Sequence, residues 1–335
     1  MTQSVPPPAA RLIVTNGDSA AKQLATAFPG STLLPWRDML HEGPVPPDLT
    51  LEDLSAVRAR FLADDTGLDH GVIAASFAAR DRTLRSHGRF EQVALWFEHD
   101  LYDQLQLAQI LDYFALEGSA ERVLLMQGDD YIGVQTPQDL RAWRERERPV
   151  DADMLAAASA VWAAFTASTP ELLAEFAEED LDSLPHLMPA IRRLLAELPA
   201  PDSGLGRTEE LALAGLAQEP QSVSALFRLT QVQEPARFLG DTPFFRMLDR
   251  MAFGPAPLIQ GLPFRATRLQ GGPEEIDYQL FAAATVSLTP VGAEVLAGRR
   301  DNVAANGLDR WIGGTRLTPE SAWRWDRTRN ALVAP

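Results

Sequence analysis

Short apolar runs alternate with helix-like stretches from residue 11 to about residue 130, and this alternation constrains the fold of the 335-residue chain more than any other feature. The apolar runs predict strands at 11–16, 31–36, 92–97 and 122–126. Helical spacing of the apolar residues between them predicts helices at 20–28, 51–63, 72–86 and 101–116. Strands that alternate with helices form a mostly parallel sheet with both faces covered. We therefore expect an α/β fold class, with a Rossmann-like domain over residues 11–148.

The composition changes to Ala, Leu and Glu at Asp151, and this change predicts a helical connector over residues 151–202. The helices expected in the connector are 154–167, 170–179 and 186–198. A segment that contains Pro and Gly, 199–206, is typical of a linker and separates the connector from the last part of the chain.

The last part, 203–335, is expected to form a winged-helix-like α+β domain with a C-terminal tail. Three short helices are predicted at 208–217, 223–230 and 243–252. Thr242 is the expected N-cap of the third helix, and Pro243 is its expected first residue. Two strands, 264–269 and 278–288, should enclose a turn at Gly271-Gly272, and a helix at 291–297 should follow. The alternative is an unrelated helical cap.

Three other features have structural interpretations. Trp323 and Trp325 lie in a short predicted strand, and we expect them to pack into a core. Arg58 and Arg60 are two positions apart on a helix, so their side chains diverge and a solvated face is expected for both. The segment 41–47 must be a loop because of its Gly and its prolines.

The chain has no cysteine, which excludes a disulfide framework, a thiolate metal site and a Cys nucleophile. Its apolar runs are shorter than the roughly 18 residues that a membrane span needs. The Pro-rich, uncharged segment 1–10 lacks the basic region of a signal peptide. From the sequence we expect an acidic cytoplasmic protein that does not contact a membrane.

The formal net charge is −16, and the excess of negative charge lies almost entirely before residue 203. Phosphate backbones are bound by clusters of Lys and Arg, so this acidic front part is not expected to carry a long nucleic-acid track. The remainder is close to neutral, and its charge neither indicates nor excludes contact with DNA.

Polar residues follow each predicted strand, and in an open parallel sheet ligands bind beyond the carboxyl ends of the strands. These positions are Asn16, Gly17, Asp18 and Ser19; Trp36, Arg37 and Asp38; Glu98, His99 and Asp100; and Asp129 and Asp130. So many carboxylates on one rim would repel one another unless a cation, a buried proton or Arg37 offsets their charge.

Helix capping explains some of these acids without any ligand. Asp18 or Ser19 could cap the first helix, and Asp100 could cap the helix after the third strand, with Asp103 three positions further on. Capping does not explain Glu98-His99 ahead of that cap, or Trp36-Arg37-Asp38 after another strand. Both interpretations stay open at this point.

Oxygen ligands with one histidine suit Mg²⁺ or Mn²⁺, so we predict a metal site formed by Asp18, Glu98 and Asp100. In an enzyme, Asp18, Asp38 and His99 are the predicted catalytic residues, with His99 handling a proton and Arg37 neutralising developing charge. The further predicted ligand-binding residues are Asn16, Gly17, Ser19, Trp36, Arg37, His41, Glu42, Asp103 and Gln104. The expected ligand is a small polar or phosphorylated molecule. Whether the site is catalytic or only binds stays open. The chain has neither a G-x-G-x-x-G nor a Walker loop, so direct binding of a dinucleotide is not expected.

A regulator is the alternative function, in which the ligand state of the first domain changes contact of the last domain with DNA or a protein partner. Arg246 and Arg250 lie four positions apart on the predicted recognition helix, and Arg265 and Arg268 lie on the predicted wing. These four arginines are the candidate nucleic-acid contacts.

Three blocks of the first half resemble the uncharacterised bacterial family known as domain of unknown function 1835. They are Thr15-Asn16-Gly17-Asp18-Ser19, Pro35-Trp36-Arg37-Asp38 with His41-Glu42-Gly43-Pro44, and the block from Trp96 to Gln104. The second half, with Leu205-Gly206-Arg207-Thr208-Glu209 and Trp311-Ile312-Gly313-Gly314, resembles the companion domain of unknown function 3658. The resemblance implies no activity, cofactor or catalytic residue.

Overall fold

The computed structural model describes residues 9–271 and 274–335 of the chain. Two expectations fall wholly or partly outside these residues: the uncharged N-terminal segment 1–10, and the turn at Gly271-Gly272. Within the described residues, no helix combines the length and the apolar character that crossing a bilayer requires.

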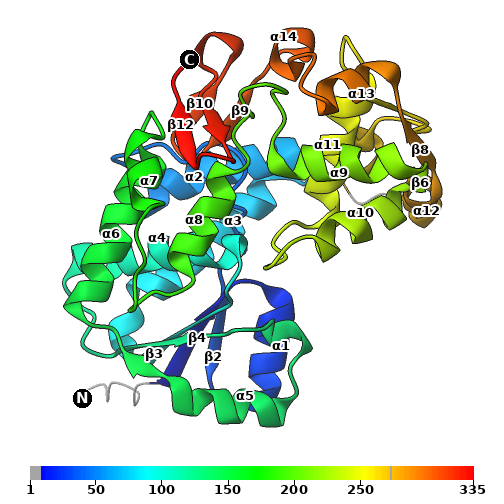
Figure 1. The fold of residues 1–335 in the computed structure, drawn as a ribbon. Coiled ribbons are helices and arrows are strands. Elements are labelled where there is room, and N and C mark those ends of the chain that lie inside the picture. Colours follow the sequence, from blue (N-terminus) through cyan, green and yellow to red (C-terminus); the bar gives the residue numbers. More distant parts are fainter. Residues whose placement is uncertain (1–8, 272–273) are drawn as a thin grey trace, which may run out of the picture.

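A five-stranded, mostly parallel sheet forms the base of the molecule in Figure 1, as the alternating pattern predicts. Its strands are β1 (Ala9–Thr15), β2 (Thr32–Pro35), β3 (Phe90–Phe97), β4 (Val123–Gln127) and the short β5 (Arg148–Pro149). Their order in the sheet is β2-β1-β3-β4-β5, and only the pairing of β5 with β4 is antiparallel among these strands. The carboxyl ends of β1 to β4 therefore meet at one edge.

Helices cover both faces of the sheet because successive strand side chains point to opposite faces. On one face, Ile13, Trp96 and Met126 pack with α1 (Asp18–Ala27) and α5 (Pro137–Trp143). On the other face, Leu12 and Leu95 belong to a larger core. That core also includes residues of α2 (Leu51–Thr66), α3 (His70–Arg85), α4 (Leu101–Glu117), α6 (Ala152–Thr166), α7 (Glu171–Phe176) and α8 (Leu187–Leu195). The three predicted connector helices therefore extend the core of the sheet.

A second core lies in the part drawn in yellow-green to orange in Figure 1. Its elements are α9 (Arg207–Gln218), β6 (Gln221–Ser222), α10 (Val223–Val232), α11 (Asp241–Phe253), β7 (Ile259–Gln260), α12 (Glu275–Ala283), β8 (Thr285–Leu288) and α13 (Pro290–Leu296). Strands β6, β8 and β7 form an antiparallel sheet in that order. The three predicted helices 208–217, 223–230 and 243–252 correspond to α9, α10 and α11.

The predicted two-stranded ribbon is wrong for most of its length. Residues Ala266–Leu269 form a short 3₁₀ helix, and Glu275–Ala283 form α12, so only Thr285–Leu288 is a strand. Tyr278 and Phe281 both pack on Phe245, with ring centroids 5.7 and 5.0 Å away. Residues three apart share one face of a helix but point to opposite faces of a strand, so this packing selects the helix.

The predicted start of α11 is also wrong. The helix begins at Asp241 with Gly240 as N-cap, so Pro243 is its third residue rather than its first. Proline is tolerated there because the N–H groups of the first turn have no partner inside the helix.

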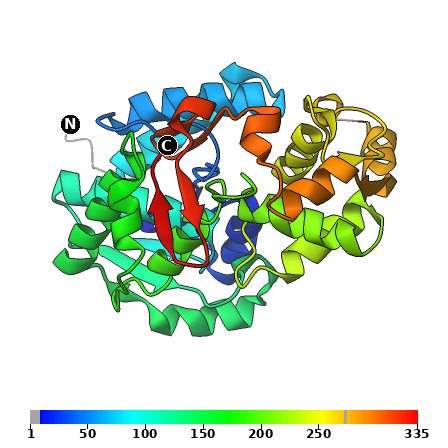
Figure 2. The same ribbon diagram turned by 45° about the horizontal axis from the view of Figure 1, so that its top comes forward.

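The C-terminal tail packs on the connector helices rather than on the second core. After α14 (Asn302–Asn306), the tail forms two hairpins, from β9 (Arg310–Ile312) and β10 (Thr315–Leu317), and from β11 (Arg324–Asp326) and β12 (Ala331–Val333). Ile312, Leu317 and Trp325 join the large core of the sheet and connector, so the expected packing of Trp325 is confirmed. Figure 2 shows the red strands over the green connector helices, and Arg327, in the turn between β11 and β12, pairs with Glu210 of α9 (2.8 Å).

We expect Gly314→Ala to detach this tail partly and to lower the free energy of unfolding by about 1–3 kcal/mol. A Cβ atom at Gly314 would lie 1.7 Å from the carbonyl oxygen of Thr166, at the end of α6, and the Gly314 N–H donates to the Phe165 carbonyl (3.0 Å). Urea denaturation measures the loss. Gly88→Ala is the control, because neither Gly88 nor Gly314 has a positive backbone φ, and a Cβ at Gly88 meets no atom within 4 Å. An equal loss in both variants would contradict the close approach to α6.

Candidate functional site

The candidate site lies where the strand order of the sheet reverses. Strand β1 has β2 on one side and β3 on the other, so the loops after β1 and β3 leave the sheet in opposite directions. In open α/β sheets, ligands bind in the crevice beyond the carboxyl ends of strands at such a point. Asn16 follows β1 and Glu98 follows β3, so both stand at this position.

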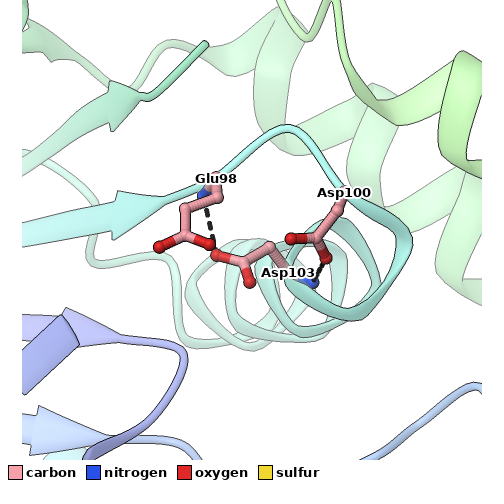
Figure 3. Close-up of side chains that lie close together, drawn as sticks. All are labelled: Glu98, Asp100 and Asp103. Atoms are coloured by element: carbon pink, nitrogen blue, oxygen red, sulfur yellow. Dashed lines mark hydrogen bonds between the residues drawn. The ribbon is translucent and has the colours of Figure 1, made fainter. Parts of the chain in front are cut away.

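Three buried carboxyl groups gather there, as Figure 3 shows. Glu98, Asp100 and Asp103 are 4, 3 and 0% exposed, and each offers an oxygen that lies within 4.8 Å of those of the other two. Among the residues that the structure describes, this is the group of acids or histidines close enough to share a metal ion. Of the predicted metal ligands, Glu98 and Asp100 belong to it. Asp103, predicted as a ligand-binding residue, completes it.

The start of α4 explains this local arrangement. Asp100 is the N-cap of the helix, and its Oδ1 accepts a hydrogen bond from the Asp103 N–H (3.1 Å). Asp103 Oδ1 in turn accepts from the Glu98 N–H (2.6 Å). The capping interpretation of Asp100 is therefore confirmed. It accounts for one carboxyl oxygen of each aspartate but gives no role to the Glu98 carboxyl.

Neighbouring loops also bind the acidic group. The Asn16 side-chain amide donates to Asp103 Oδ2 (2.8 Å), and the Ile132 N–H, beyond β4, donates to Glu98 Oε1 (2.6 Å). Gln104 donates its amide to the Glu98 carbonyl (2.6 Å), while its fully buried Oε1 has no hydrogen-bond partner among the described residues. The group thus ties together the loops after three adjacent strands and leaves one buried acceptor unused.

Burial and mutual repulsion favour the protonated forms of these acids. Burial, with the Asp100 charge beside it, raises the pKa of Glu98 to about 8. Burial raises the pKa of Asp100 to about 7, and burial with both neighbouring carboxylates raises the pKa of Asp103 well above its usual range. Within the described residues, no Lys or Arg lies within salt-bridge distance of any of the three. Near neutral pH the group must therefore hold protons or a cation.

Asp18 does not join this group, which corrects the predicted metal set. It is the first residue of α1, its side chain is mostly exposed, and it pairs with Arg37 through Nε (2.9 Å) and Nη2 (2.5 Å). This ion pair lowers the pKa of Asp18. Arg37 therefore neutralises Asp18 at the surface rather than the buried acids. Ser19 is exposed nearby, and a Cβ at Gly17 would lie 4.0 Å from the Tyr102 hydroxyl.

Asp38 and Trp36 belong to the core, so their predicted catalytic and ligand-binding roles do not fit their positions. Asp38 is buried and pairs with the buried Arg58 at 2.9 Å. The expectation that Arg58 faces solvent is therefore wrong, whereas Arg60 is exposed. Trp36 is fully buried, its Nε1 donates to Gln109 (2.8 Å), and Arg80 stacks on its ring.

The predicted histidines lie in two different places. His99 is half-buried beside Tyr131 and His186, with ring centroids 5.2 and 6.0 Å away, and burial lowers its pKa. His41 and Glu42 instead line a small hollow that Leu101 also borders. The sequence did not suggest Tyr131 or His186, because neither residue immediately follows a predicted strand.

Three of the four arginines predicted to contact nucleic acid make contacts within the chain. Arg246 forms an ion pair with Asp65 at the end of α2, which removes it from a free recognition surface. Arg265 lies 3.8 Å from Asp249 and stacks on Phe253, and Arg268 pairs with Asp277 at 2.9 Å. Arg250 is exposed and has no ion pair among the described residues.

Comparisons with known proteins do not identify the site. No family model matches the chain, and no curated protein matches it. One solved structure with partial likeness is the Plasmodium falciparum topoisomerase II DNA-binding, cleavage and re-ligation domain, with 10% identity and a TM-score of 0.41. The match covers 98% of this chain and 55% of that chain, so the chain spans about half its length. We draw nothing about fold or function from a likeness of this degree.

Proposed function

We propose that the carboxyl edge of the sheet binds a divalent cation, Mg²⁺ or Mn²⁺, through Glu98, Asp100 and Asp103, and through it a small polar or phosphorylated ligand. The observation that carries this proposal is the set of three buried carboxyl groups whose oxygens lie within 4.8 Å of one another. Carboxylate oxygens are the ligands that these cations prefer. A cation there would replace the protons that the group must otherwise hold.

The buried Oε1 of Gln104 supports the proposal, because it is an acceptor without a donor beside the acidic group. Leaving such a group unsatisfied is costly, and a cation or a metal-bound water would satisfy it. Mg²⁺ is commonly bound by a few carboxylates and by substrate phosphates, which is why a phosphorylated ligand is the preferred class. In an enzyme, the cation would supply charge stabilisation for phosphoester chemistry, and half-buried His99 is the nearby proton carrier in the chain.

We expect Mn²⁺ to bind the full chain at one site and Asp103→Asn to weaken that binding at least about tenfold. Even outer-shell changes weaken metal affinity about 10- to 100-fold, and Asp103 would be a direct ligand. Titration of the electron paramagnetic resonance signal of free Mn²⁺ measures the binding. Asp18→Asn is the matched control, since it removes one exposed acid at the same sheet edge and should leave the affinity unchanged.

Two results would contradict the metal site. One is the absence of saturable Mn²⁺ binding to the wild-type chain at pH 8. The other is equal weakening in Asp103→Asn and Asp18→Asn, because this would indicate a loose response to net charge.

The finer architecture is also proposed here. The order β2-β1-β3-β4 with its reversal beside β1 supports a Rossmann-like domain, and three helices with the antiparallel sheet β6-β8-β7 support a winged-helix-like domain. In the second domain, α12 occupies the connection between β7 and β8 where a wing would lie. The three N-terminal blocks that resemble domain of unknown function 1835 all lie at the carboxyl ends of β1, β2 and β3, which is also the edge of the proposed metal site. The ion pair of Arg246 with Asp65 does not favour DNA contact through α11.

A further inference from the structure

A cavity of about 520 Å³ lies away from the acidic group, between α11, α14 and the start of β9. Its volume is within the roughly 300–1,000 Å³ typical of small-molecule sites. A smaller hollow of about 80 Å³ adjoins it, and the two share Arg250, Arg310, Glu209 and Asp309 as lining residues. Two arginines and two acids therefore stand in the wall between the cavity and the hollow.

Arg310 makes no hydrogen bond or ion pair with any described residue, and its Nε is buried. Together with Arg193, its charge lowers the pKa of the buried Glu197 carboxyl, which is already held by Arg193 (2.7 Å) and by the Thr208 hydroxyl (2.6 Å). Arg250 is exposed and has no ion pair within the described part of the chain. Buried donors are nearly always satisfied in proteins, so the buried Arg310 Nε beside a cavity points to an acceptor supplied from outside.

The carboxylates of the cavity wall are already engaged. Asp309 pairs with Arg316 through two contacts of 3.0 Å, and Asp249 accepts from the Ala266 N–H (2.8 Å). Glu209 accepts from the Gly206 N–H at the start of α9 (2.9 Å). These acids have local partners, whereas Arg250 and Arg310 remain available to an anion.

His41 adds a second buried polar group without a partner, in the adjoining hollow. Both of its ring nitrogens are buried and lack hydrogen-bond partners among the described residues. The ring is held between Tyr102 and Phe238, with centroid separations of 6.1 and 5.2 Å. A neutral imidazole can donate one N–H to an anionic oxygen without adding charge.

We propose that this cavity binds a small molecule that carries a phosphate or carboxylate group, with Arg310 and Arg250 contacting its anionic oxygens. The planar guanidinium matches both groups through paired N–H donors. This site is independent of the metal site proposed above, because it is formed by α11, α14 and β9 rather than by the sheet edge.

Isothermal titration calorimetry of the full chain, treated with EDTA and then freed of it by desalting, tests the proposal, with inorganic phosphate and citrate as separate probes. EDTA removes divalent cations, so failure of this site and failure of the metal site are distinguishable. We expect saturable binding of at least one probe at one site. Arg310→Gln should weaken it roughly 10-fold or more, as loss of a charge-assisted hydrogen bond predicts.

Arg89→Gln is the matched control, because it makes the same charge change at an exposed position just before β3 and should leave the affinity unchanged. Arg310→Lys keeps the positive charge but loses the paired N–H donors of the guanidinium. It is the variant to titrate if Arg310→Gln does not fold. Binding of phosphate alone or of citrate alone assigns the anionic group. Absence of saturable binding of both probes, or equal weakening by Arg310→Gln and Arg89→Gln, would overturn the site.

Discussion

Replacing Arg58 by methionine is expected to lower the free energy of unfolding by about 3–5 kcal/mol, because it leaves the buried carboxylate of Asp38 without its cation. Both side chains are almost fully buried, and they meet at 2.9 Å. The Arg58 guanidinium also donates to three carbonyl groups of the loop after β2, those of Met39, Glu42 and Pro44. Methionine keeps much of the side-chain volume, so the loss reports the charge and the hydrogen bonds.

Arg60→Met is the matched control for Arg58→Met, because Arg60 lies on the same helix and is exposed. Surface substitutions of this kind usually change stability by less than about 0.5 kcal/mol. Urea denaturation with a common slope for all variants measures both effects. Similar small losses in the two variants would contradict a structural role for the Asp38–Arg58 pair and would return Asp38 to the list of candidate catalytic groups.

The stability of the metal-free chain is expected to fall as the pH rises from about 7 to about 8.5. The folded chain raises the pKa of Glu98 to about 8 and that of Asp100 to about 7, above the usual values of 4.5 and 3.8. The unfolded chain releases these protons near pH 4, so above that pH the folded chain holds more protons and its stability falls with rising pH until the folded carboxyl groups have also ionised. Each unit of raised pKa corresponds to about 1.4 kcal/mol, so the loss accumulated from about pH 4 is on the order of several kcal/mol, of which about 1–2 kcal/mol falls between pH 7 and 8.5.

Histidines add little to the change of stability between pH 7 and 8.5. Burial lowers the pKa of His41 to about 4 and also lowers those of His99 and His186, so their effect on the free energy of unfolding is nearly complete below pH 7. Thermal unfolding in EDTA at several pH values measures the decline. Glu98→Gln should reduce the decline, and Mn²⁺ should reverse it in the wild-type chain by binding the folded state.

Asp18→Asn is the control for the pH dependence, since Asp18 is exposed and its pKa is lowered rather than raised. It should leave the decline between pH 7 and 8.5 as it is in the wild-type chain. A stability that is constant or rising across this window would contradict the burial of three acids without a cationic partner.

Much of the candidate site could be predicted from the sequence, because the carboxyl ends of parallel strands meet at one edge. Asn16, Glu98 and Asp100 are identified in this way, while Asp103 enters as the residue three positions after the predicted helix cap at Asp100. The sequence could not separate them from Asp18 and Asp38. Asp18 begins a surface helix and turns to Arg37, while Asp38 meets Arg58, which is twenty positions away on a different element.

The α9 to α13 part shows the same limit for secondary structure. The apolar residues of 278–288 fit a strand by composition, but the segment before Ala284 is helical because Tyr278 and Phe281 share one surface of Phe245. Local propensity is a weak preference, and packing on a neighbouring helix overrides it.

The sequence by itself determined the parallel strands, their covering helices and the edge at which polar residues gather, because these follow from local periodicity and from the direction of each strand. The tertiary structure decided which charges are neutralised and which are left in need of a partner. Arg58 and Arg246 are paired with acids from distant segments, while Glu98, Asp100 and Asp103 face one another and Arg310 borders a cavity. The reason is physical: the free energy of a charge depends on its burial and on the groups within a few ångströms, and long-range packing sets both.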